Sequence, residues 1–131
     1  MNAPLARLLL DRFRWTDTAL RTQLAALGWP AMTPAQSLVF ATIDAGGTRP
    51  TDLAASIGVS RQAIHQTINE LIDVDLLELV NDPSDGRAKL VRVTAAGREN
   101  IAAAKSALSQ IEARLRRRIG SENVDALRSA L

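Results

Sequence analysis

The sequence predicts a mainly α-helical fold with one small β-hairpin. Aromatic residues make up only 3% of the chain, so the core must consist mostly of Leu, Ile, Val and Ala, a composition that favours helices. Over most of the chain the apolar residues recur every three or four positions, which is the period of an amphipathic helix. Between residues 76 and 93 the period changes to two around the turn-forming segment D-P-S-D-G, which predicts two short strands joined by a turn.

Length and composition limit the possible functions. The 131 residues suffice for one domain with its own core, so we expect a single domain over residues 1–131. The absence of cysteine, the single histidine and the lack of a glycine-rich phosphate loop argue against an enzyme and against a bound metal or other cofactor. The first residues lack the layout of a signal peptide and no apolar stretch could span a bilayer, so we expect a cytoplasmic protein without membrane contact.

Long amphipathic helices are expected near both ends. The first, over about residues 3–28, carries a stripe of five leucines and one phenylalanine and should end at Gly28. The second region, about residues 95–131, begins after the cap residue Thr94 and repeats apolar residues at heptad spacing. The two stripes could pack on one another within one chain or on a second copy. Because a small domain cannot easily cover both, we expect these to be dimerisation helices of a homodimer.

The core between them, about residues 32–94, should begin with a helix whose cap is Thr33 in a T-x-x-Q capping box. A short helix over about residues 50–57 follows and is stopped by Gly58, and Ser60 caps another helix only two residues later. That last helix is apolar on one face and polar on the other. Two helices joined by a tight glycine turn, with the second polar on its outer face, form a helix-turn-helix pattern.

A β-hairpin should follow this pattern, with strands over residues 76–80 and 87–93. Asp82 and Pro83 suit the first two positions of a type I turn, and Gly86 is expected to supply a left-handed residue. A helix-turn-helix followed by a hairpin is a winged helix-turn-helix.

In three segments the chain resembles the MarR family of bacterial transcriptional regulators: MTPAQSLVFATI, TDLAASIGVSRQAIHQTINEL and DPSDGRAKLVRVTAAG. The most specific part is D-x-R-A-K followed by L-x-x-x-T-x-x-G. The resemblance implies a homodimer that binds near-palindromic double-stranded DNA, more commonly as a repressor, and that a small aromatic effector often releases. One departure is that Asp75 stands where the family often has a glycine before the hairpin and that no arginine follows Glu78, which implies weaker phosphate contacts along the first strand.

The polar face of the second helix of the motif should contact DNA, because such a helix lies in the major groove with its N-terminal half toward the bases. Arg61 can form two hydrogen bonds to guanine, and Gln62 and Gln66 can pair with adenine or with a phosphate. A lone histidine cannot build a metal site, so His65 is expected to be a DNA contact, and Ser60 a helix cap and phosphate donor. The candidate residues on this helix are Ser60, Arg61, Gln62, His65, Gln66 and Asn69.

The tip of the hairpin carries two basic residues, Arg87 and Lys89, which strand alternation places on one face. The resemblance implies that Arg87 reaches the minor groove or its phosphates and that Lys89 contacts the DNA backbone. It also implies that Asp85 holds Arg87 in place, with Gly86 supporting the turn.

Two further hypotheses concern other partners. A winged helix can serve only for protein contacts, and the seven acidic against five basic residues between positions 49 and 92 favour that alternative, although the polar helix face argues against it. An effector site is expected near Trp15 and Trp29, with Trp15 facing the winged helix and Arg12 and Arg14 available to pair with an aromatic acid. The alternative that both tryptophans only fill the core stays open.

Overall fold

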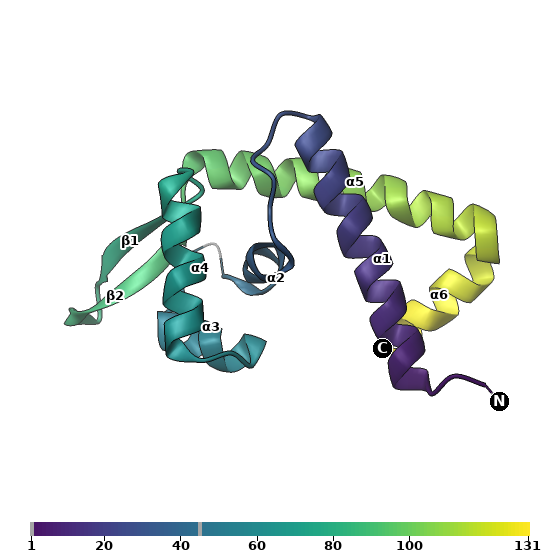
Figure 1. Ribbon diagram of the computed structural model, residues 1–131, viewed down its shortest axis with the longest axis horizontal. Coiled ribbons are helices and arrows are strands. Elements are labelled where there is room, and N and C mark those ends of the chain that lie inside the picture. The colour runs from purple at the N-terminus through teal and green to yellow at the C-terminus, as the bar shows by residue number, and fades with distance from the viewer. Residues whose placement is uncertain (1, 45) are drawn as a thin grey trace.

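The computed structural model describes residues 2–44 and 46–131. The elements of this part of the chain are, in order, α1 Leu5–Ala26, α2 Pro34–Thr42, α3 Pro50–Ile57, α4 Arg61–Asp73, β1 Leu77–Asp82, β2 Asp85–Val93, α5 Ala95–Ile119 and α6 Ser121–Ala130. Figure 1 shows α2, α3, α4 and the hairpin together at one end, α1 and α6 at the other, and α5 spanning both. The predicted winged helix-turn-helix with flanking helices is confirmed. Among the described helices, none combines the length and the apolar character needed to cross a membrane.

The helix-turn-helix is built from local caps, as predicted. The Thr33 hydroxyl accepts a hydrogen bond from the backbone N–H of Gln36 at 3.2 Å, and the Gln36 side chain accepts one from the backbone N–H of Thr33 at 3.0 Å. Gly58 ends α3 in the left-handed region with φ +81°. The Ser60 hydroxyl then accepts a hydrogen bond from the Ala63 backbone N–H at 3.1 Å, which starts α4. These contacts set a tight turn between α3 and α4.

A continuous apolar core lies between α2, α3, α4 and the hairpin. From α4 it receives Ile64, Ile68 and Leu71, spaced three or four residues apart, so that the opposite face of that helix stays outside. The hairpin contributes alternate residues of its inner face. The buried members of the core are Val39, Leu53, Ala54, Ile64, Ile68, Leu71, Leu76, Leu77, Val91 and Val93.

The hairpin turn is tighter than predicted and consists of Pro83 and Ser84 alone, with Asp82 paired to Asp85. Asp82 and Pro83 hold the first two turn positions, but the expectation of a left-handed Gly86 is wrong, since its φ is not positive. The reason is that the Asp82 carboxylate closes the turn by accepting bonds from the Ser84 N–H at 2.9 Å and hydroxyl at 2.7 Å. Gly86 instead lies where the strand register shifts, next to the tip.

A third backbone segment pairs with the hairpin. Thr48, in the loop before α3, forms an antiparallel bridge to Val91 through two backbone hydrogen bonds of 2.9 Å. This bridge fixes the start of the helix-turn-helix against β2, and the sequence pattern did not indicate it.

The junction between the hairpin and α5 is closely packed. Thr94 caps α5 by accepting a bond from the Gly97 backbone N–H at 2.9 Å, and its hydroxyl donates to the Asp75 carbonyl at 2.6 Å. Asp75 has φ +60°, the left-handed conformation in which a glycine would be unstrained. A Cβ atom at Gly97 would lie only 2.2 Å from the Leu76 carbonyl oxygen, so this position requires glycine.

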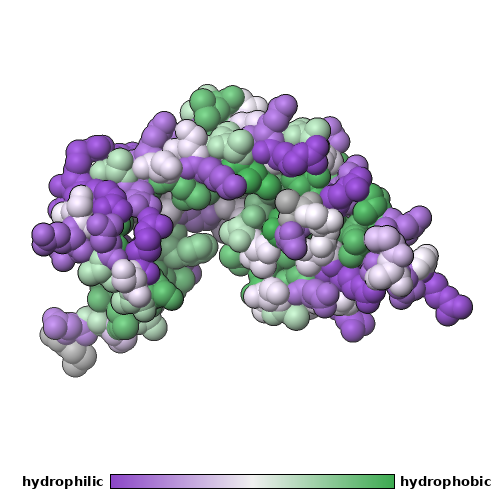
Figure 2. All heavy atoms as spheres, turned by 180° about the vertical axis from the view of Figure 1, so that it is seen from behind, coloured by the Kyte–Doolittle hydropathy of each residue, from purple (hydrophilic) through white to green (hydrophobic). Residues whose placement is uncertain are grey.

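Helix α1 crosses α5, and its second half packs there while its first half does not (Figure 1). Leu24 is buried, and the Gln23 amide donates a hydrogen bond to the Gln110 side chain on α5. By contrast Leu5 and Phe13 are 71% and 51% exposed. Figure 2 shows apolar side chains over the start of this helix, at the lower left. Pro4 is the N-cap of α1.

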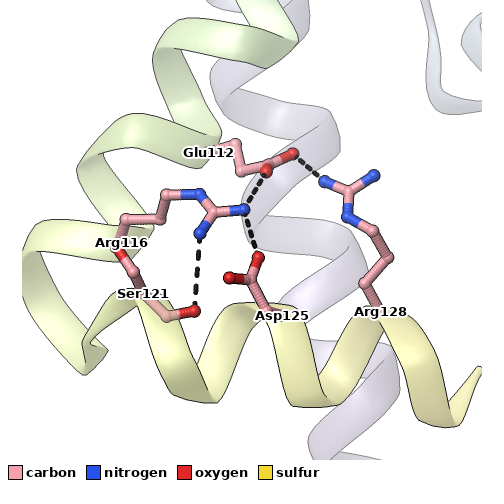
Figure 3. A network of polar contacts seen from close by, with 5 residues as sticks. All are labelled: Glu112, Arg116, Ser121, Asp125 and Arg128. Carbon is pink, nitrogen blue, oxygen red and sulfur yellow. Dashed lines mark hydrogen bonds and ion pairs between the residues drawn. The ribbon is translucent and has the colours of Figure 1, made fainter.

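Helix α6 folds back toward α1 after a sharp bend at Gly120, where φ is +92°. An ionic network holds it against α5 (Figure 3): Arg116 pairs with Glu112 at 3.1 Å and with Asp125 at 2.7 Å, and Arg128 pairs with Glu112 at 2.6 Å. Arg128, and to a lesser extent Arg116, lower the pKa of Glu112 below its usual value. The basic residues at the end of α5 therefore include one, Arg116, that is engaged within the protein.

Candidate nucleic-acid interface

The outer face of α4 presents a row of polar side chains. All of the predicted contact residues of this helix are exposed, whereas Ile64 and Ile68, which lie between them in the sequence, belong to its buried apolar face. The thirteen residues of α4 make a rod about 20 Å long. An α-helix is about 10–12 Å across, which fits the major groove of DNA, about 12 Å wide. The exposed members of this row, named the α4 polar row below, are Ser60, Arg61, Gln62, His65, Gln66 and Asn69.

One member of the α4 polar row is oriented by neighbouring side chains. The Gln66 amide donates a hydrogen bond of 3.3 Å to Glu70, whose other carboxylate oxygen accepts one of 2.7 Å from Gln36 on α2. Because Gln36 is itself held in the capping box of α2, this chain of bonds ties Gln66 to the body of the fold. The remaining carbonyl of Gln66 stays available to a partner.

The wing tip presents Arg87 and Lys89, both exposed. The Lys89 ammonium lies against the Asn81 side chain of the opposite strand, which holds it on the hairpin. Asp85 accepts a hydrogen bond from the backbone N–H of Arg87 at 3.1 Å. Asp85 therefore holds Arg87 through a bond to its backbone. The guanidinium of Arg87 has no hydrogen-bond partner among the described residues.

An ion pair between an exposed arginine and a buried carboxylate joins the wing to the helix-turn-helix. Two nitrogens of Arg49, the residue before α3, bond to one carboxylate oxygen of Asp82 at 2.9 and 2.7 Å. The bonds from Ser84, followed by the one from Arg49, lower the pKa of Asp82 from 3.8 to about 2. The carboxylate thus stays ionised and fixes the base of the turn relative to α3. The sequence did not predict this ion pair, because 33 residues separate its two partners.

A second ion pair lies on the outer face of the hairpin. The Arg92 guanidinium bonds to one oxygen of Glu78 at 2.9 and 2.8 Å. The acidic residue on β1 therefore engages a basic residue of β2 that would otherwise face solvent as a free cation. This pairing gives a structural basis for the expectation that the first strand contributes little to phosphate binding.

A cavity of about 360 Å³ lies between α1, α2 and α5, and the loop between α1 and α2 adds Pro30 and Met32 to its lining. Its lining is mostly apolar and includes Phe13, Leu24, Met32 and Phe40. The described lining does not include the predicted effector residues Trp15, Trp29, Arg12 and Arg14, and their role in effector binding stays a prediction.

The two tryptophans face other parts of the molecule. Trp15 lines a separate groove with residues of α5 and α6, among them Ile111 and Val124, so the expectation that it faces the winged helix is wrong. Helix α1 crosses α5 (Figure 1), and the residues that share this groove with Trp15 show that its side of α1 meets the C-terminal helices. Trp29 packs on the winged-helix core, which agrees with the core-filling alternative, and Arg12 and Arg14 are exposed.

Polar groups of the cavity come from three helices. Asp17 on α1 accepts hydrogen bonds from the Ser37 hydroxyl on α2 and from Arg21 at 3.0 Å, and Arg21 also donates to the Met32 carbonyl at 3.2 Å. Asn100 on α5 is 2% exposed and its Nδ2 atom has no hydrogen-bond partner. These residues had no sequence signal, because each appears as a single polar position on an apolar helix face. Within the described residues, no group of three or more His, Cys, Asp or Glu side chains could hold a metal ion.

The sequence model of the MarR family matches residues 32–88, from just before α2 to the wing tip. The chain carries a MarR-family winged helix. The match contains the α4 polar row and Arg87, and it ends one residue before Lys89. No curated protein sequence matches the chain.

Solved structures extend the likeness from the MarR-family winged helix to the flanking helices. The apo form of wild-type MarR from E. coli is 23% identical, with a TM-score of 0.80, and the match covers 99% of this chain and 96% of that one. The transcriptional repressor CouR, bound to a 23-mer DNA duplex, is 28% identical with a TM-score of 0.76, covering 97% and 89%. A transcriptional regulator from Thermotoga maritima is 23% identical with a TM-score of 0.68, covering 97% and 88%. The fold, including α1, α5 and α6, is therefore that of known transcriptional regulators.

Proposed function

We propose that this protein is a DNA-binding transcriptional regulator that binds a near-palindromic operator as a homodimer and acts as a repressor. The observation that carries the proposal is the α4 polar row, exposed over the length of a helix whose opposite face is the protein core. A surface built for protein contacts would carry aromatic or other large apolar side chains at its centre, and this one carries Arg, Gln, His and Asn. The similarity to CouR, whose structure holds DNA, supports the same conclusion.

The wing and the helix have different tasks in this proposal. Arg87 and Lys89 neutralise phosphates and place the protein on the duplex, while Arg61 and Gln66 read base edges in the major groove. Arg49 and Asp82 contact no DNA and keep the wing at a set distance from α3.

The DNA test is a gel shift on random genomic fragments, followed by selection of the bound sequences. Enrichment of one inverted repeat is the expected result, and failure to shift any fragment at low salt would reject the proposal in favour of a protein-contact module. With a selected site, Arg87→Ala should flatten the slope of log K against log salt by about one unit, whatever the sequence. Gln66→Ala should cost about 1–3 kcal/mol at particular base pairs only. Equal losses on every sequence for both variants would contradict the division of tasks.

We propose that the dimer forms through α1, α5 and α6. The unpacked first half of α1 and the end of α6 expose large apolar side chains, among them Leu5, Leu9 and Leu131, which a single chain leaves in water. A second copy offers the same surface about a twofold axis and covers both. One chain carries one winged helix for DNA binding, and the dimer carries two, which fits the two half-sites of a near-palindromic operator.

The dimer test is a pair of substitutions on an exposed face that should not disturb folding. Leu5→Glu combined with Leu9→Glu should give folded monomers in light scattering, with helical content retained by circular dichroism. The control is Leu79→Glu on β1, where the side chain is 47% exposed and lies far from the terminal helices, and which should remain dimeric. A dimer in the double variant would place the interface elsewhere.

We also propose that a small molecule releases the DNA by binding the cavity between α1, α2 and α5. The cavity lies where the terminal helices meet the winged helix. A ligand bound there can therefore change the distance between the two winged helices of the dimer. By linkage, a ligand that weakens DNA binding must bind more tightly to the DNA-free arrangement than to the DNA-bound one.

A further inference from the structure

We propose that the cavity between α1, α2 and α5 takes an uncharged, largely apolar molecule bearing a carbonyl group, with Asn100 as the residue that binds the carbonyl. This rests on the proposed role of that cavity as the effector site, and it differs from the expectation of an aromatic acid held by arginines. Three observations carry it: the volume, the pairing of every other buried polar group, and the charges at the wall.

The volume and the lining set the size and the body of the ligand. At about 360 Å³ the cavity falls in the range of ordinary small-molecule pockets and is more than twice the size of a cavity that binds benzene. Its aromatic and aliphatic walls, with Phe13 and Phe40 among them, suit a body of about two fused rings.

Asn100 is the buried polar residue of this cavity that still needs a partner. Among the other polar side chains of the lining, Ser37 and Arg21 both donate to the Asp17 carboxylate. The Thr16 hydroxyl donates to the Arg12 carbonyl within α1 at 2.9 Å. The Asn100 Nδ2 atom is buried without a partner, which is costly for an amide N–H. Rotation about χ2 exchanges the two ends of the amide, so its N–H₂ can be presented to a ligand carbonyl in the cavity.

The charges at the wall disfavour an acid. The buried carboxylate is that of Asp17, and the guanidinium of Arg21 is already engaged by it and by the Met32 carbonyl. A ligand carboxylate would lose its hydration, meet a like charge and find no free cation in the buried part of the site. Lys105, which is exposed at the edge of the lining, is the one further cation among the lining residues.

The test uses two probes of the same size and shape, 2-acetylnaphthalene and 2-naphthoate, titrated into the dimeric protein by calorimetry at neutral pH without DNA. The ketone should bind and the acid should bind about tenfold more weakly or not at all. The variant Asn100→Leu keeps the volume and removes the amide, so the ketone should lose about fivefold in affinity, the usual net value of one hydrogen bond. Since the amide is unpaired in the free protein, this variant should melt at or above the wild-type temperature.

Two controls keep the outcome clear. If Asn100→Leu fails to fold, 2-ethylnaphthalene replaces the mutation, because it has the shape of the ketone without the oxygen and should bind about fivefold more weakly to the wild type. Lys105→Met tests the cation at the edge and should leave ketone binding unchanged. Acid binding as tight as that of the ketone, abolished by Lys105→Met, would overturn the inference, as would equal affinity for ketone and hydrocarbon.

The calorimetry separates this inference from the proposed function, because it does not involve DNA. Release of operator by the ketone is measured in parallel by fluorescence anisotropy. If the ketone binds through Asn100 but the protein binds no DNA sequence, the inferred ligand class is supported and the proposed regulatory function is rejected. If the protein binds DNA and none of the probes binds in the cavity, only the inferred ligand class is rejected.

Discussion

The substitution Gly97→Ala should destabilise the protein sharply, although alanine is the better helix former. Gly97 lies in the first turn of α5, where the hairpin ends and the helix begins. An added Cβ would lie 2.2 Å from the Leu76 carbonyl oxygen and 2.6 Å from a methyl carbon of Val93. The carbonyl cannot easily retreat, because it also accepts the backbone N–H of Thr94 at 3.2 Å.

The expected magnitude is a balance of two terms. Overpacking of a filled core costs about 1–3 kcal/mol, and a contact with backbone rather than with a movable side chain belongs at the upper end. Replacing glycine by alanine within a helix raises the free energy of unfolding by about 0.5–1 kcal/mol. The net loss in the free energy of unfolding should therefore be roughly 2 kcal/mol, or on the order of 5–10 °C in the melting temperature for a chain of this size.

The assay is chemical denaturation followed by circular dichroism, with all variants at one protein concentration because a dimer melts in a concentration-dependent way. Gly86→Ala is the matched control: it is the same change of residue, at a site with no atom within 4 Å of the new Cβ and no positive φ, and it should alter the stability by less than about 0.5 kcal/mol. If Gly97→Ala is as stable as Gly86→Ala, the packing at the junction of β2 and α5 is looser than described.

Three further predictions concern the hairpin and its ends. Asp75→Gly should raise the free energy of unfolding by about 0.5–1 kcal/mol in urea melts, because φ is +60° there, and Asp75→Val should lower it. Glu78→Gln should free Arg92 and steepen the salt dependence of DNA binding by about one phosphate, and an unchanged slope would mean that this guanidinium does not reach the backbone. Asp82, whose pKa is lowered from 3.8 to about 2, contributes stability above its ordinary pKa that is lost as the pH falls toward 2. Asp82→Asn should therefore be less stable than the wild type at about pH 6, and a deficit that does not shrink in acid would exclude this carboxylate as the cause.

Much of the winged helix was readable from the sequence because its signals act over a few residues. The caps at Thr33, Ser60 and Thr94 each bond a backbone N–H within three residues, so their spacing alone identifies the helix starts. The polar face of α4 followed in the same way from the helical period. The composition of the α4 polar row is thus a property of the sequence.

Local rules failed where another contact, near or far in the sequence, decided the conformation. The turn at Pro83 and Ser84 needs no left-handed glycine, because the Asp82 carboxylate closes it. Gly86 therefore lies in β2, where the register of the two strands is irregular. Conversely Asp75 adopts the conformation of a glycine, since Thr94 holds its carbonyl from the far end of the hairpin.

Only the tertiary structure could decide which residues meet across long separations. The sequence specified that α1 has an apolar stripe, but the angle at which it crosses α5 turned Trp15 away from the winged helix and left Phe13 at the cavity. The pairing of Arg49 with Asp82 and the isolation of the Asn100 amide likewise depend on where three packed helices and a hairpin bring single side chains. Helical periodicity states which face of an element is apolar, and the packing of the whole chain determines what covers that face and which polar groups remain without a partner.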